Sequence, residues 1–261
     1  MIRRLIMDLE TSPNVVYSWR TGYNLNIGHD NMIQERAIIC ICYKWEGEEK
    51  VHSLTWDKDH CDKAMLLKFK PVMDAADEVV AHNGDRFDVK WFRTRCLFHN
   101  IPCQPRFVTD DTLRSAKGKF YFNSNRLDYI AQFLNVGKKT ETGGFQLWRD
   151  VLAGKKSALK QMVDYCKNDV AILEAVWQKL STYTEPKIHA GVQTGGYKHH
   201  CPRCGGPNTK RNRKTTTALG TPKVQMICTS KGCGSYFTLT ESVYMKSMAD
   251  EEKALGRRII K

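Results

Sequence analysis

The chain has 261 residues, of which 41% are hydrophobic and 10% aromatic, and it carries a formal net charge of +13. It has no apolar run of about 18 residues and no apolar N-terminal segment, so we expect neither a membrane span nor a signal peptide. So much positive charge favours a polyanionic partner, of which nucleic acid is the common one, over a basic surface without a partner.

Ten cysteines raise the question of a disulfide framework. Six of them, at positions 40, 42, 61, 96, 103 and 166, are scattered among apolar residues, and the other four form two pairs near the C-terminus. This distribution is typical of a reducing compartment and one metal-bound cluster, so we expect a cytoplasmic protein.

The apolar pattern predicts an α/β fold. Strands are expected in the stretch 3–13 and over 37–45 and 50–56, which together favour a three-stranded antiparallel meander. Further strands at 78–82 and 107–110 alternate with helices predicted at 61–76, 88–99, 111–117 and 127–134. A flexible loop at 138–146 and a helical segment at 158–180, in one or two pieces, follow. This order predicts a mixed central sheet flanked by helices.

A change in composition predicts two domains. Residues 186–198 contain Pro186 and three glycines with few apolar side chains, and we interpret them as a linker between residues 1–185 and residues 199–261. From Lys187 onward the chain has 14 Lys and Arg and 4 Asp and Glu, a net charge of +10, whereas residues 1–186 have 27 and 24, a net charge of +3. Most of the positive charge therefore lies in the small C-terminal part.

Two acids, Asp8 and Glu10, stand two residues apart in the first apolar stretch. Side chains of a strand alternate between its faces, so Asp8 and Glu10 share one face while Leu5, Met7 and Leu9 share the other. Two adjacent carboxylates on a mostly buried strand repel each other and lose hydration, which a divalent cation such as Mg²⁺ or Mn²⁺ compensates. The alternative is a strand end at which both acids face water.

Two later segments carry further acids. Asp88 follows the turn of residues 82–87 at the start of a predicted helix, where the helix macrodipole alone would also favour it. In the segment 158–180, Tyr165 and Asp169 are four residues apart and share a face beside the apolar stripe, so Asp169 is expected to be partly buried and to need a partner. Acids at positions 85, 110 and 111 are rivals of Asp88, and we expect Asp111 to be structural.

The order Asp-x-Glu-Thr, Asn-x-x-x-Phe-Asp and Tyr-x-x-x-Asp, beginning at Asp8, Asn83 and Tyr165, resembles the DEDD superfamily of 3′–5′ exonucleases over residues 1–182. It is similar to the tyrosine branch, as in proofreading domains of DNA polymerases and their free-standing relatives. The resemblance implies an RNase H-like fold and the release of nucleoside monophosphates from 3′ ends. It also implies that two Mg²⁺ or Mn²⁺ ions are held by Asp8, Glu10, Asp88 and Asp169, and that Tyr165 positions the attacking water.

The same resemblance places Leu9 and Thr11 against the terminal nucleotide, with Asn83 and Phe87 bordering the same pocket. We expect DNA, single-stranded or at a 3′ end, because nothing in the sequence clearly reads a 2′-hydroxyl; an RNA-trimming exonuclease is the alternative. Any proofreading would serve a separate DNA polymerase as partner. A catalytically idle module that binds nucleic acid or docks to a polymerase is a further alternative.

Residues 117–122, Lys-Gly-Lys-Phe-Tyr-Phe, interleave basic and aromatic side chains. This pattern is typical of a surface that stacks single-stranded bases, and equally of an ordinary core segment.

Two cysteine pairs, Cys201-Pro-Arg-Cys204 and Cys228-x4-Cys233, resemble the knuckles of a zinc ribbon bridged by a β-hairpin. Four thiolates would hold a structural Zn²⁺ in a closed site, and the ion would supply much of the folding energy of so small a unit. Free thiols or a disulfide are the alternative, and the neighbouring His199 or His200 could replace a cysteine.

The segment between the cysteine pairs is basic. Lys210, Arg211, Arg213 and Lys214, together with aromatic residues 236 and 237, predict a grip on nucleic acid, and docking to another protein is the competing role. A last helix-like stretch at 247–258 is only weakly amphipathic, and we expect it to fray.

Overall fold

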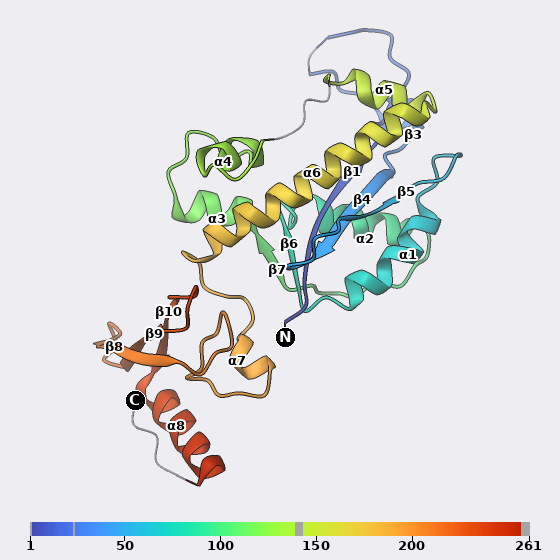
Figure 1. The fold of residues 1–261 in the computed structure, drawn as a ribbon. Coiled ribbons are helices and arrows are strands. Elements are labelled where there is room, and N and C mark those ends of the chain that lie inside the picture. Colours follow the sequence, from blue (N-terminus) through green and yellow to red (C-terminus); the bar gives the residue numbers. More distant parts are fainter. Residues whose placement is uncertain (1, 23, 139–142, 257–261) are drawn as a thin grey trace. The chain divides into compact units, whose positions relative to one another are not determined.

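Figure 1 shows the fold as a computed structural model, which describes residues 2–22, 24–138 and 143–256. The chain forms two compact units, one of residues 3–177 and one made mainly of the residues from Gln178 onward. The division falls inside the longest helix, α6 (Lys156–Ser181). Within the described ranges, no helix has the length and apolar character needed to cross a membrane.

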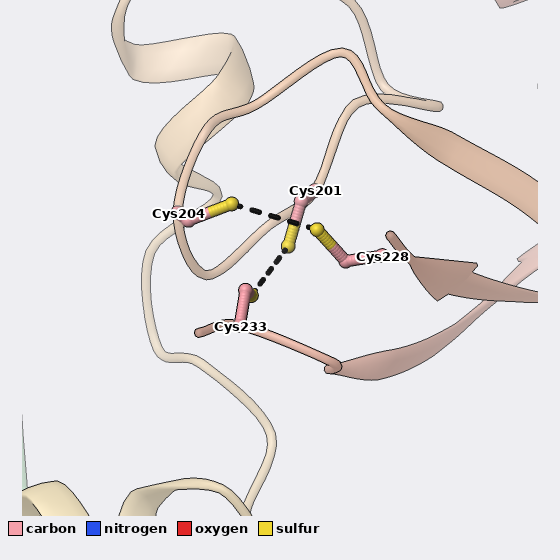
Figure 2. Close-up of side chains that lie close together, drawn as sticks. All are labelled: Cys201, Cys204, Cys228 and Cys233. Carbon is pink, nitrogen blue, oxygen red and sulfur yellow. Dashed lines mark hydrogen bonds between the residues drawn. The ribbon is translucent and has the colours of Figure 1, made fainter. Parts of the chain in front are cut away.

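The smaller unit is built on a three-stranded antiparallel sheet of order β10-β9-β8. Its strands are β8 (Thr209–Thr216), β9 (Pro222–Cys228) and β10 (Tyr236–Thr240), preceded by the short helix α7 (Ala190–Gln193) and followed by α8 (Glu241–Leu255). The predicted hairpin is β8–β9, and the segments at its open end bring the two cysteine pairs together (Figure 2). This is the architecture predicted for a zinc ribbon.

Helix α8 is better anchored than the sequence indicated. The Thr240 hydroxyl accepts a hydrogen bond from the backbone N–H of Val243 (3.3 Å), which caps the helix well before the predicted start at 247. Tyr244 and Met248 pack against apolar side chains of β9. The expectation of fraying is wrong over 247–255, because tertiary packing rather than amphipathicity alone holds the helix. Residues 257 and 258 of that stretch lie outside the described residues.

The larger unit is organised by a five-stranded mixed sheet of order β5-β4-β1-β6-β7 (Figure 1). β1 (Arg4–Thr11), β4 (Ile38–Trp45) and β5 (His52–Thr55) form the predicted antiparallel meander, and β6 (Glu78–Ala81) and β7 (Thr109–Asp111) continue the sheet parallel to β1. A small extra sheet of β2 (Val15–Val16) and β3 (Met32–Gln34), with the 3-10 helix His29–Asn31, lies in the polar stretch after β1. The predicted mixed α/β fold is confirmed.

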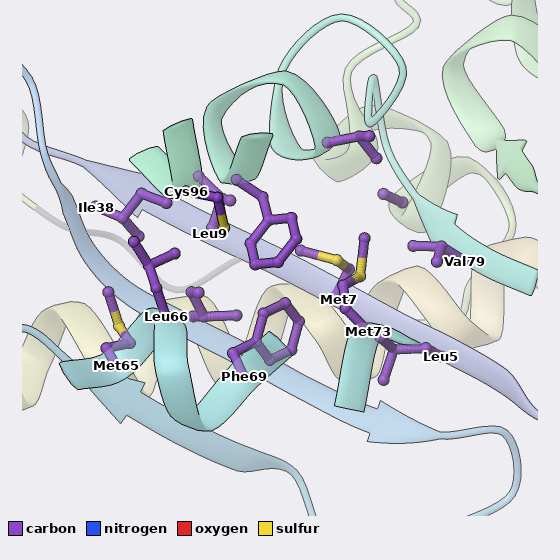
Figure 3. Packing of buried hydrophobic residues seen from close by; sticks show 14 of the residues in the cluster. Leu5, Met7, Leu9, Ile38, Met65, Leu66, Phe69, Met73, Val79 and Cys96 are labelled. Atoms are coloured by element: carbon purple, nitrogen blue, oxygen red, sulfur yellow. The ribbon is translucent and has the colours of Figure 1, made fainter. Parts of the chain in front are cut away.

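One face of this sheet carries the hydrophobic core (Figure 3). Leu5, Met7 and Leu9 of β1 are at most 2% exposed and pack with buried side chains of α1 (Lys63–Asp74) and α2 (Asp88–Phe98). Burying each such side chain contributes about 1.5–3 kcal/mol. The core therefore fixes the rotation of β1, and strand alternation turns Asp8 and Glu10 to the opposite face, as predicted.

Helix α6 covers that opposite face. Lys44 of β4 forms an ion pair with Glu174 of α6, and the indole N–H of Trp177 donates to Asp110 of β7 (2.8 Å). The segment predicted in one or two pieces is a single helix, because its buried stripe continues without interruption through Cys166, Val170, Leu173 and Trp177.

The remaining helices of the larger unit are α3 (Thr112–Lys119), α4 (Leu127–Phe133) and α5 (Gln146–Leu152). Helix α5 was not predicted, and it begins at the last residue of the loop expected at 138–146. Residues 139–142 of that loop lie outside the described residues.

Candidate active site

Carboxylates from β1 and α6 converge on the polar face of the large sheet. Oxygen atoms of Asp8, Glu10 and Asp169 lie within 4.8 Å of one another. β1 supplies the first two by alternation, and Asp169 borders the buried stripe of α6 and is only 2% exposed. Carboxylates this close repel one another unless a cation or a shared proton intervenes. Because hard oxygen ligands are those that Mg²⁺ and Mn²⁺ prefer, this donor set fits a divalent-ion site.

Asp88 approaches the same strand from the first turn of α2. Its Oδ1 accepts a hydrogen bond from the backbone N–H of Leu9 (3.1 Å), the residue between Asp8 and Glu10. That N–H is available because β1 pairs with β6 only over residues 4–6. Asp88 is not one of the three acids grouped within 4.8 Å, but its bond to Leu9 places it beside them.

Asp88 is nearly inaccessible to solvent, and this governs its protonation. Burial is the largest influence and, with the nearby negative charge of Asp111, raises the pKa of the Asp88 carboxyl to about 7, although hydrogen bonds from backbone N–H groups oppose the rise. A cation bound nearby would favour the ionised form. A buried acid with so perturbed a pKa is typical of a functional site.

The turn that carries Asp88 is tightly constrained. Asn83 has a φ of +70°, and a Cβ added to Gly84 would lie 2.5 Å from the Cβ of Ala81. The Asp111 carboxylate accepts from the N–H of Asn83 (2.9 Å) and from that of Leu113 (2.9 Å), so it ties the turn to the start of α3. Asp111 therefore has the structural role expected of it.

The other rival acids also make contacts between elements. Asp85 binds the Arg114 guanidinium (2.7 Å) and the Thr109 hydroxyl (2.5 Å), and Asp110 accepts from Trp177. These bonds give both residues structural roles.

Three thiols lie next to the acids. Cys42 and Cys40 of β4 stand opposite Asp8 and Glu10 in the strand register, and the Cys166 thiol lies 3.4 Å from Oδ2 of Asp8. The three sulfur atoms are within 4.8 Å of one another. Small side chains at these positions let α6 approach β1 closely enough to bring its acid to the site.

A pocket of about 1020 Å³ is lined by Asp8 and Tyr165. It also contains three basic side chains, Lys117, Arg126 and Lys138. The rest of its lining is formed by His82, Asn83, Leu113, Asn125, Leu127, Asp128, Gly143 and Gly144. Sequence reasoning missed Arg126 and Lys138, because only the fold brings their separate segments to one cavity. The pocket can accept an anionic ligand next to the acids.

The predicted substrate residues of this unit differ in accessibility. The Leu9 side chain is 2% exposed within the core, and the Phe87 ring packs against the core and against Trp91. Thr11 is 8% exposed, and its carbonyl oxygen accepts from the indole N–H of Trp148 (3.1 Å). Of the four residues, Asn83 lines the pocket.

The smaller unit brings all four predicted zinc ligands together (Figure 2). The sulfur atoms of Cys201 and Cys233 are 3.7 Å apart, those of Cys204 and Cys228 are 3.6 Å apart, and all four lie within 4.8 Å of one another. Four sulfur donors in one closed group fit a tetrahedral Zn²⁺ site.

The two histidines beside the first pair bind elsewhere. Their Nε2 atoms contact Glu251 of α8, at 2.7 Å from His199 and 3.0 Å from His200. The idea that either replaces a cysteine is wrong, because the Glu251 carboxylate occupies both imidazoles and the four cysteines form their own group.

The basic residues of the smaller unit lie on β8, an edge strand. Lys210, Arg211, Arg213 and Lys214 are all exposed. Arg211 lies over the ring of Tyr244 (5.8 Å to its centroid), and Lys214 pairs with Glu241 (2.6 Å). The strand thus presents a positively charged strip that is partly tied to α8.

Comparison with known proteins assigns the family. Residues 29–181, more than half of the chain, match the family described as RNase_H superfamily, and the chain belongs to this superfamily. The match begins after β1, so Asp8 and Glu10 lie outside it. No curated protein sequence matches the chain.

A solved structure shows the same fold. The family B DNA polymerase from the hyperthermophilic archaeon Pyrobaculum calidifontis is similar with 14% sequence identity and a TM-score of 0.53, over 70% of this chain and 25% of the polymerase. This chain therefore corresponds to about a quarter of that polymerase's length. The RNase H-like fold implied by the motifs is confirmed, and family and fold support a nuclease-type activity on nucleic acid.

Proposed function

We propose that this protein is a metal-dependent 3′–5′ exonuclease that releases nucleoside monophosphates from DNA ends. One observation carries the proposal: oxygen atoms of Asp8, Glu10 and Asp169 meet within 4.8 Å, and Asp8 lines a pocket with three basic side chains. The direction of cleavage is supported by the resemblance of the three motifs to the DEDD exonucleases.

The proposed chemistry follows from the residues around the pocket. Asp8, Glu10, Asp88 and Asp169 would hold two Mg²⁺ or Mn²⁺ ions, which when bound supply Lewis-acid chemistry at the phosphodiester. Tyr165 lines the pocket with Asp8. An ordinary phenol keeps its proton at neutral pH, so Tyr165 is suited to orienting the attacking water by a hydrogen bond rather than to deprotonating it. Lys117, Arg126 and Lys138 would bind the phosphates of the strand.

The decisive assay compares oligonucleotides of one sequence labelled at the 3′ or the 5′ end, as DNA and as RNA, with Mg²⁺ or Mn²⁺. We expect early loss of the 3′ label, release of nucleoside monophosphates and a preference for DNA. Asp8→Asn and Asp169→Asn should each lower turnover by about 100-fold or more. Asp164→Asn is the matched control, because Asp164 is half exposed and pairs with Lys160 (2.6 Å) on the same helix.

Three results would contradict the proposal. Full activity in Asp8→Asn would refute the assignment of the acids, and early loss of the 5′ label would refute the direction. Faster shortening of RNA than of DNA would favour the RNA-trimming alternative.

We propose that the smaller unit holds a structural Zn²⁺ and adds a nucleic-acid contact along β8. Lys210 and Arg213 are the residues to test, since Arg211 and Lys214 also contact α8. Their double substitution by Ala should lower affinity and reduce the slope of log affinity against log salt by about 1.4, as expected for two lost phosphate contacts on a single strand. Lys253→Ala, exposed on α8, is the control. An unchanged slope would favour docking to a protein, such as a separate DNA polymerase.

A further inference from the structure

Tyr121 stands out on the surface beside the pocket. It lies in the connection between α3 and α4 and is fully exposed, at 108% of its reference area. Lys117 precedes it by four residues, Asn125 follows it by four, and both line the pocket. Four residues of extended chain span at most about 14 Å, so the ring lies within a few nucleotides of any strand bound there.

The backbone on both sides of Tyr121 is held by other rings. Phe120 and Phe122 stack on each other (centroids 5.3 Å apart, interplanar angle 28°), and Phe122 meets Phe133 of α4 edge to face (5.3 Å, 75°). Phe133 in turn stacks on Tyr129 (6.4 Å, 23°). This packing turns Phe120 and Phe122 inward and leaves the ring between them outward, so its exposure is fixed by the fold rather than by a loose loop.

The chemistry around Tyr121 favours a polyanion. Lys119 and Arg126, both exposed, flank it in the chain, and Lys117 lies in the pocket. An exposed aromatic ring among basic side chains is the usual platform for the bases of a single strand, whose phosphates the basic side chains bind. Phe133, whose ring meets that of Phe122, is also 61% exposed, so a second ring is available to the bases, and the exposed Lys119 and Arg126 favour a polyanion over an apolar protein partner.

One residue that lines the neighbouring pocket, Asn125, has a polar atom that is unsatisfied within the described part of the chain. Oδ1 of Asn125 is buried, and no hydrogen-bond partner for it occurs among the residues that the structure describes. Buried acceptors in proteins are nearly always paired.

We propose that Tyr121 is a stacking platform for a base of the single-stranded nucleic acid whose end enters the pocket. The inference rests on the proposed function for the nature of that end.

Direct binding to the full-length protein tests this proposal, with a fluorescent single-stranded oligonucleotide and without divalent ions. Tyr121→Ala should weaken binding by about 5- to 140-fold, the range for one lost base–aromatic stack. Tyr121→Phe keeps the ring and should bind like the wild type. Phe98→Ala removes an exposed ring (63%) from the last turn of α2, the helix on the core face of the sheet, and should also have no effect.

The oligonucleotide supplies the second half of the test. A series with one abasic site, moved stepwise from the 3′ end, should contain one position that weakens wild-type binding as much as Tyr121→Ala does. At that position Tyr121→Ala should cause no further loss, since both changes remove the same stack. In turnover, Tyr121→Ala should raise KM for the single strand, leave kcat unchanged and leave KM for a dinucleotide unchanged.

The outcomes separate this inference from the proposed function. Wild-type affinity in Tyr121→Ala, or an equal loss with every abasic oligonucleotide, would overturn the stacking role even if the enzyme shortens DNA. A protein that binds as described but shortens no oligonucleotide would retain the platform and lose the exonuclease assignment.

Discussion

The three clustered carboxylates should make Asp169→Asn stabilising without metal, and the same substitution should remove most of the stabilisation that Mg²⁺ gives the wild type. Two unit charges 4.8 Å apart repel by about 3.5 kcal/mol at an effective dielectric constant of 20 and about 0.9 kcal/mol at 80. The three acids form three repelling pairs, and Asp169→Asn abolishes the two pairs that include residue 169. Because Asp8 and Glu10 are partly exposed and water screens part of the repulsion, we expect the metal-free variant to gain about 1–3 kcal/mol in free energy of unfolding.

Added Mg²⁺ should stabilise the wild type far more than the variant. At a concentration 100 times its Kd, an ion that binds only the folded protein adds about 2.7 kcal/mol to the wild type. A chain of this size changes its Tm by about 2–4 °C per kcal/mol, so the wild type should rise by about 5–11 °C. Asp169→Asn should lose most of that rise, whereas Asp164→Asn should keep it, since its exposed ion pair lies outside the cluster.

Tryptophan fluorescence during heating is the appropriate readout. All six tryptophans lie between residues 19 and 177, so the signal follows the larger unit and not the ribbon. A rise of wild-type size in Asp169→Asn would refute the assignment of these acids as an ion site. A metal-free Tm below that of the wild type would refute the repulsion argument.

Three further predictions concern the scaffold of the site. Asp62→Asn should lower the free energy of unfolding at pH 7 by about 3–5 kcal/mol in urea titrations, because it leaves the buried Arg95 guanidinium, now bound at 2.7 and 3.0 Å, without its anion. Burial alone raises the pKa of the Asp62 carboxyl, but hydrogen bonds led by the one from Arg95 hold this pKa below the ordinary 3.8. The wild type should therefore lose the stabilisation by the ionised Asp62 only when the pH falls below 3.8. Equal stability of the two proteins at pH 7 would contradict the reasoning. Gly84→Ala should lower the free energy of unfolding by about 1–3 kcal/mol and impair turnover, because the added Cβ would lie 2.5 Å from the Cβ of Ala81. Gly118→Ala is the control, since a Cβ added there meets nothing within 4 Å. Equal effects of the two substitutions would argue against the tight turn. Chelation should release one Zn²⁺ per chain and unfold the ribbon while the fluorescence transition persists, and retention of ribbon circular dichroism after metal removal would speak against a folding role for the ion.

Local periodicity was sufficient to predict the parts of the fold on which the acids stand. The alternation in β1 predicts that Asp8 and Glu10 lie on the face of the strand away from Leu5 and Leu9. The apolar stripe of α6 predicts that Asp169 is buried. These features depend on neighbours in the sequence and on one buried face, which is why they can be predicted without coordinates.

Other features depend on distant segments and could not be predicted. The bond from Leu9 to Asp88 requires that β6 stop pairing with β1 after residue 6, which is a matter of strand register. Arg126 reaches the pocket from the residue just before α4, and Tyr244 and Met248 of α8 are buried by contacts with β9. No periodicity in the sequence encodes these long-range contacts.

Because side chains of β1 alternate between its two faces, the length of that strand decides which face each side chain occupies. A single-residue deletion before Asp8 would exchange its two faces, carrying both carboxylates into the hydrocarbon interior and the leucines out toward α6. Insertions or deletions of two residues would leave each side chain on its original face. Single-codon length changes in this strand should therefore be lost under selection far more often than substitutions at the same positions, and β1 should evolve by replacement with its length unchanged.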